Sequence, residues 1–74
     1  MQAERLVMMV NQIAGFFARE GPERGAAQTA NHLVKFWDPR MRRAIVAHLE
    51  AGGEGLHPLA RQAVTLLTKE TAQP

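Results

Sequence analysis

The stretch Phe36-Trp37-Asp38-Pro39-Arg40-Met41 decides the fold, because it ends one helix and begins the next. An Asp carboxylate accepts hydrogen bonds from the free N–H groups of a first helical turn, so we expect Asp38 to be an N-cap. Pro39 suits the first helical position, where an N–H would have no partner. It also disfavours helical backbone at Asp38. The stretch therefore predicts a sharp corner between two helices.

Helical periodicity on both sides of this corner predicts four helices. Apolar residues recur at spacings of three and four in each of four segments, and Gly or Pro separates the segments. The expected helices span residues 3–20, 23–37, 39–51 and 58–69. No segment has the alternating pattern of a strand, so we expect an all-α fold, a small four-helix domain with short turns. Residues 1–74 should form this single domain, with flexible residues at both ends.

The first helix carries an unusual set of large side chains, Met8, Met9, Phe16 and Phe17. Met is a flexible gap-filler of cores, and the two Phe residues lie on or beside the apolar stripe of the helix. We therefore expect these residues to pack in the core. A groove for a partner is the alternative interpretation.

Length and composition limit what the chain can do. A domain of about this size buries only about 60% of its unfolded surface, so a partner is expected to add stability. The absence of Cys removes disulfides and thiolate-held zinc or iron–sulfur clusters. A net charge of +2 is a weak argument for nucleic acid. We find no run long enough to span a membrane and no secretory signal, which leads us to expect a cytoplasmic protein.

The sequence offers little support for catalysis. It has no Ser or Cys to act as a nucleophile, and His32, His48 and His57 fall on different predicted helices or helix ends. None of them forms an i, i+4 metal-binding pair. The glycine-rich loop at 51–55 lacks the Lys and Ser or Thr of a phosphate loop, so a structural turn is expected. We predict no catalytic, cofactor-binding or metal-binding residue in this chain.

The residues around the corner are better suited to contact a protein. Trp37, Arg40, Arg42 and Arg43 gather there, and Trp and Arg are enriched at interface hot spots. Cations are unfavourable at a helix N-terminus, which already carries partial positive charge. We therefore expect these four residues to bind a partner. Two alternatives stay open, a core position for Trp37 and a solvated face for the arginines, and a nucleic-acid-binding helix-turn-helix is a weaker one.

Three separated segments carry a resemblance to a known family. They are LVMMVNQIA at Leu6–Ala14, FWDPRMR at Phe36–Arg42 and AGGEGLHPL at Ala51–Leu59. Together, over roughly residues 4–67, they resemble the delta subunit of NAD-dependent, molybdenum-containing formate dehydrogenase. Val10 stands where that family often has Ala, and His57 where Asp is frequent. Neither change alters the expected helices and turns.

The resemblance implies a non-catalytic accessory subunit of a bacterial cytoplasmic complex that converts formate and NAD to CO2 and NADH. The chain would dock on the large molybdenum-containing catalytic subunit and support assembly or stability. Bis-molybdopterin guanine dinucleotide, iron–sulfur clusters, FMN and NAD would be held by that subunit and the diaphorase subunits, and none by this chain. A transient factor for molybdenum cofactor loading is the alternative role, and the isolated chain could self-associate. Neither nucleic acid nor a membrane is expected as a partner.

Overall fold

Four helices build the chain, which confirms the all-α prediction. The computed structural model describes residues 2–72, with side chains for residues 2–69, and contains no strand in that range. The elements are α1 (Ala3–Phe17), the short 3-10 helix η1 (Ala18–Glu20), α2 (Pro22–Phe36), α3 (Pro39–Glu50) and α4 (Pro58–Ala72). The last helix therefore continues beyond its predicted end at residue 69. The predicted flexibility of the chain ends concerns in part residues 1 and 73–74, which lie outside the described residues.

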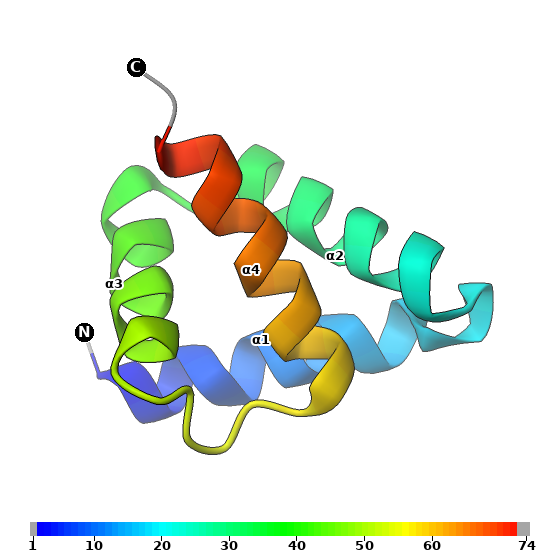
Figure 1. Ribbon diagram of the computed structural model, residues 1–74, viewed down its shortest axis with the longest axis horizontal. Coiled ribbons are helices and arrows are strands. Elements are labelled where there is room, and N and C mark those ends of the chain that lie inside the picture. Colours follow the sequence, from blue (N-terminus) through cyan, green and yellow to red (C-terminus); the bar gives the residue numbers. More distant parts are fainter. Residues whose placement is uncertain (1, 73–74) are drawn as a thin grey trace.

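Helix α4 is the centre of the fold. It contacts each of the other three helices, and Figure 1 shows it between α3 and α2, above α1. Its Ala60, Ala63, Val64 and Leu67 are completely buried. Around them packs a core contributed by the other elements: Leu6, Val7, Val10, Ala14, Leu33, Trp37, Ile45 and Leu56. The alanines on the apolar face of α4 are small, so the neighbouring helices can approach α4 closely.

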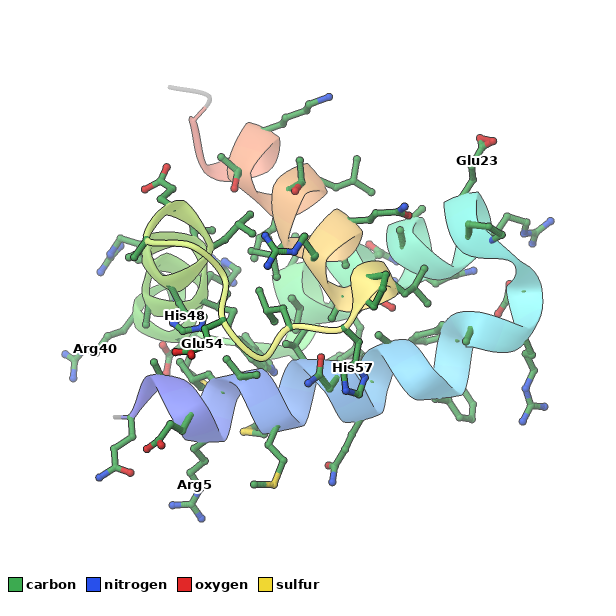
Figure 2. All side chains as sticks on the ribbon, turned by 60° about the horizontal axis from the view of Figure 1, so that its bottom comes forward. Arg5, Glu23, Arg40, His48, Glu54 and His57 are labelled. Atoms are coloured by element: carbon green, nitrogen blue, oxygen red, sulfur yellow. The ribbon has the colours of Figure 1, made fainter. Side chains whose placement is uncertain are left out.

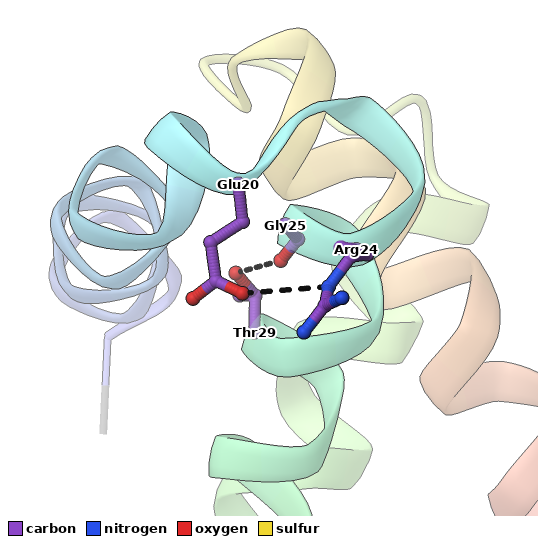
Figure 3. A network of polar contacts seen from close by, with 4 residues as sticks. All are labelled: Glu20, Arg24, Gly25 and Thr29. Carbon is purple, nitrogen blue, oxygen red and sulfur yellow. Dashed lines mark hydrogen bonds and ion pairs between the residues drawn. The ribbon is translucent and has the colours of Figure 1, made fainter.

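The start of α2 packs so tightly that Gly25 has no room for a side chain. A Cβ there would lie 2.9 Å from the Phe17 carbonyl oxygen and 3.1 Å from a methyl carbon of Leu59. The hydroxyl of the completely buried Thr29 donates to the Gly25 carbonyl at 2.7 Å (Figure 3). Gly25 thus lies where α1, α2 and α4 meet. Its carbonyl also gives the buried Thr29 hydroxyl a hydrogen-bond partner.

The turn from α1 to α2 depends on Gly21, whose φ of 92° is a conformation that other residues rarely adopt. Its N–H donates to the Ala18 carbonyl at 3.1 Å, and its carbonyl accepts from the Gly25 N–H at 2.8 Å. An ion pair of 3.6 Å between Glu20 and the exposed Arg24 spans the same turn (Figure 3). Exposed pairs of this kind add little stability, so the backbone and the packing at Gly25 set the turn.

The loop at residues 51–57, between α3 and α4, is tied to α1 by Asn11. The Nδ2 of Asn11 donates to the Gly55 carbonyl, and its Oδ1 accepts from the His57 N–H, both at 3.0 Å. The two loop groups are 44 and 46 positions away from Asn11 in the sequence. One amide side chain therefore joins the first helix to the entry of the last.

Two further side chains hold the same loop from α3 and α4. Nε2 of His48 bonds the Glu54 carbonyl at 2.7 Å, and Nη2 of Arg61 donates to the carbonyls of Gly52 and Gly53 at 3.0 Å. Gly53 has a φ of 66°, and a Cβ there would lie 2.9 Å from the guanidinium nitrogens of Arg61. The glycines thus serve backbone geometry and close packing, in line with the structural role expected for them.

We expect Gly25→Ala to lower the free energy of unfolding by about 1–3 kcal/mol, because the new methyl would overlap a backbone oxygen of the neighbouring helix. Gly15→Ala is the matched control, since a Cβ at Gly15 meets nothing within 4 Å. That change should stabilise α1 by about 0.5–1 kcal/mol. Urea unfolding of both variants gives the comparison, and a Gly25→Ala variant as stable as wild type would contradict the close packing.

Asn11→Asp should destabilise the fold by about 1–2 kcal/mol at neutral pH. The substitution keeps an acceptor for the His57 N–H but places a carboxylate oxygen against the Gly55 carbonyl. Gln12→Glu makes the same chemical change at the adjacent, exposed position and should shift stability by less than about 0.5 kcal/mol. Equal unfolding midpoints for the two variants would show that the Asn11 bridge carries no stability.

Candidate partner-binding site

The corner at residues 36–41 has the capping chemistry expected from the sequence. Oδ1 of Asp38 accepts from the Met41 N–H at 2.9 Å, and Pro39 is the first residue of α3. On the other side, the Trp37 N–H donates to the Leu33 carbonyl at 3.0 Å and closes the last turn of α2. Two residues therefore separate the helices, Trp37 as the C-cap of α2 and Asp38 as the N-cap of α3, one more than the sequence predicted.

Arg42 joins the two helices across this corner. Its Nη1 donates to the Val34 carbonyl at 3.2 Å and also to the Trp37 carbonyl. Carbonyls at the end of a helix lack partners within it and carry partial negative charge. The half-buried guanidinium therefore caps α2, and this contact offsets the unfavourable place of a cation at the start of α3. Arg42 is thus engaged within the chain, and the partner contact expected for it stays a prediction.

Trp37 lies in the core. Its side chain is only 5% exposed and belongs to the same buried cluster as Leu33, Ile45 and Leu67. The alternative of a core position is the one that the structure supports. The ring has almost no free surface for another protein, so the partner contact expected for Trp37 is corrected to a packing role.

Arg40 and Arg43 are the two exposed arginines of the predicted set. They are three positions apart, so they lie on the same side of α3. Within residues 2–69 neither makes an ion pair or hydrogen bond. Figure 2 shows Arg40 reaching away from the body of the molecule. Of the four predicted contact residues, these two keep the position that a partner contact needs.

The largest exposed apolar side chains lie elsewhere, which the sequence interpretation missed. Phe36 is 71% exposed, Phe16 63% and Met8 60%, while Phe17 and Met9 are half-buried. The expectation that Met8 and Phe16 pack in the core is therefore wrong. The apolar stripe of α1 is wider than the surface that the neighbouring helices cover. The width of the stripe alone could have indicated that its Phe16 side stays exposed.

The three histidines are used separately. His48 holds the loop, His57 is exposed at the start of α4 (Figure 2), and His32 packs against the ring of Phe36 with centroids 4.7 Å apart. Across residues 2–69, no three His, Asp or Glu side chains come together in a metal-binding group. No helix in the described part of the chain is apolar over a length that would cross a bilayer.

A sequence model of one family, the NADH-dependent formate dehydrogenase delta subunit FdsD, matches residues 5–64. The chain belongs to this family. The delta-subunit match covers the α2–α3 corner, Asn11 and the loop at 51–57. It confirms the resemblance drawn from the three sequence segments. Comparison with curated proteins and with solved structures gave no match.

Arg42→Ala should destabilise the delta-subunit chain by about 1–2 kcal/mol, because it leaves two helix-end carbonyls without their donor. Arg42→Lys should recover only part of this loss, since a single ammonium group does not reproduce the guanidinium fork. Arg43→Ala removes the same charge from an exposed neighbouring position and should stay within about 0.5 kcal/mol of wild type. Thermal unfolding measures all three, and equal effects of Arg42→Ala and Arg43→Ala would argue against the cap.

Proposed function

We propose that the chain is a non-catalytic accessory subunit that docks on the molybdenum-containing catalytic subunit of a cytoplasmic formate dehydrogenase and supports its assembly or stability. The family match over residues 5–64 carries this proposal, since the family is described as a subunit of that enzyme. A role in binding agrees with the exposed apolar rings and the unpaired arginines of the chain.

The donor set of this chain does not fit the redox groups of such an enzyme. Iron–sulfur clusters are held by Cys thiolates, and the sequence has no Cys. Within residues 2–69 no three His, Asp or Glu side chains form a group that could hold a metal ion, and the sequence has no Ser or Cys to act as a nucleophile. We therefore assign the molybdenum cofactor, the iron–sulfur clusters, FMN and NAD to the catalytic and diaphorase subunits. This chain contributes a binding surface to the complex.

Exposed rings make a stable complex favourable for a domain of this size. Phe16 and Phe36 leave most of their surface in water, and removing apolar surface from water yields roughly 25 cal/mol per Å². Arg40 and Arg43 add unpaired cations that can meet carboxylates of a partner. Both features favour a protein contact over a free domain.

A tagged chain co-expressed with the other subunits should co-purify with formate dehydrogenase activity in about one equivalent, as a permanent subunit does. Stoichiometry is read from the purified active complex by quantitative mass spectrometry. Recovery of only trace amounts would contradict the subunit role and favour the transient loading factor.

Arg40→Ala combined with Arg43→Ala should weaken retention in the complex by about tenfold, the loss typical of a moderate interface contact. Arg24→Ala is the matched control, because Arg24 is also exposed but lies on α2. Arg42 stays unchanged in this test, since its loss would perturb the fold. Retention equal to wild type would remove the two arginines from the interface while leaving the subunit role to the stoichiometry measurement.

A further inference from the structure

Four rings form a connected surface along one side of α1 and α2. Phe16 and Phe17 meet edge to face with centroids 5.1 Å apart, Phe17 lies 6.3 Å from His32, and His32 lies 4.7 Å from Phe36. We call these four residues the aromatic face. Its two ends, Phe16 and Phe36, are the most exposed large apolar side chains among residues 2–69. A folded domain normally exposes such residues singly, so a linked set is unusual.

The aromatic face continues into a groove at the beginning of α1. The groove has a volume of about 520 Å³ and is lined by Gln2, Arg5, Leu6, Met9, Asp38 and Met41. Met9 precedes Phe16 by seven positions and Ile13 precedes Phe17 by four, which places them on the same side of α1. Both are half-buried and pack against the core. The groove and the aromatic face therefore form one strip along α1, in which apolar side chains alternate with the polar Gln2, Arg5 and Asp38 of the groove.

Cations border this strip. The guanidinium carbon of Arg19 lies 5.5 Å from the centroid of the Phe16 ring, and Arg5 lines the groove. Lys35 follows His32 by three positions on α2, which places the two residues on the same side of that helix. Arg5 and Lys35 make no ion pair within residues 2–69. Figure 2 shows Arg5 and Arg40 both extending away from the helices.

The acids near the strip are already engaged. Glu20 is paired with Arg24, and an oxygen of Asp38 accepts from the Met41 N–H. The Asp38 carboxylate keeps its negative charge, but Arg5, Arg19 and Lys35 outnumber it, so the border of the strip carries an excess of positive charge. Electrostatic complementarity at an interface requires that a partner supply negative charge at these places.

We infer that this strip is the docking surface of the chain, and that it receives a polypeptide segment whose apolar side chains are flanked by carboxylates. The inference rests on the proposed function and names the surface that the docking uses. A second copy of the chain fits less well, because a symmetric pair of strips brings the cations of the two copies together. Nucleic acid fits less well too, because the net charge is only +2 and the acidic Asp38 is among the residues that line the groove.

The test uses the full chain and a nuclease-treated formate dehydrogenase complex assembled without it, with binding followed by biolayer interferometry. Phe16→Asp combined with Phe36→Asp should weaken binding by about thirtyfold or more, as expected for interface hot spots. Leu66→Asp is the matched control: Leu66 is an exposed apolar residue of α4 and is not part of the strip. It should change binding by less than about twofold. All the substituted side chains are exposed, so circular dichroism should show unchanged folds.

A second comparison tests the charge of the partner. Arg5→Glu combined with Lys35→Glu should weaken binding, and wild-type affinity should fall as salt screens the border charges. Salt-independent binding together with wild-type affinity of this charge-reversed variant would overturn the carboxylate assignment.

The remaining outcomes separate this inference from the function on which it rests. Wild-type binding that the aromatic substitutions leave unchanged would overturn the docking surface alone. Failure of the wild-type chain to bind the complex would overturn the proposed function and this inference with it. An isolated wild-type dimer that Phe16→Asp with Phe36→Asp converts to a monomer in sedimentation experiments would assign the strip to a second copy. Association that requires nucleic acid, and so disappears on nuclease treatment, would overturn the polypeptide assignment.

Discussion

The corner between α2 and α3 is held by two side chains that act on opposite helix ends. Asp38 accepts from a free N–H of α3, and Arg42 donates to the unpaired carbonyls of α2. Both helices pack on α4, so the direction in which the chain turns here determines how they can cover it. The same turn delivers Trp37 into the core. Without this reciprocal capping, the largest core side chain and the two helices beside it would lose their fixed relation.

The helices could be predicted because residues next to each boundary signal where a helix starts or ends. Gly21 with Pro22 and Asp38 with Pro39 are local signals, and each marks a helix boundary in the structure. The end of α4 is the exception. The polar residues after position 67 suggested a tail, yet the Thr68 hydroxyl donates to the Val64 carbonyl four residues back, as Thr65 does to Arg61. These bonds give each threonine hydroxyl a partner inside the helix, so the polar residues are compatible with a helix although they do not favour one.

The roles of the candidate site residues were less predictable, because they depend on contacts with residues elsewhere in the sequence. Nothing near Arg42 distinguishes it from Arg40 and Arg43 until the end of α2 is placed beside it. Trp37 could be assigned to the core only once α3 and α4 surrounded it. The periodicity placed Phe16 in an apolar stripe, but periodicity does not say how much of a stripe the neighbouring helices cover. Exposure, the property that matters most for docking, is decided by the whole assembly of helices.

The side chains that hold the loop at 51–57 form their hydrogen bonds with its main-chain groups. His48 and Arg61 bind carbonyl oxygens, and Asn11 binds one carbonyl and one N–H, so none of these hydrogen bonds uses a loop side chain. The glycine positions are constrained, while the side chains of Glu54 and His57 are exposed. A change of the His57 side chain would therefore leave these main-chain bonds in place. Two surface positions of this loop are open to evolutionary drift, and a spectroscopic label placed there would report on the complex without disturbing the fold.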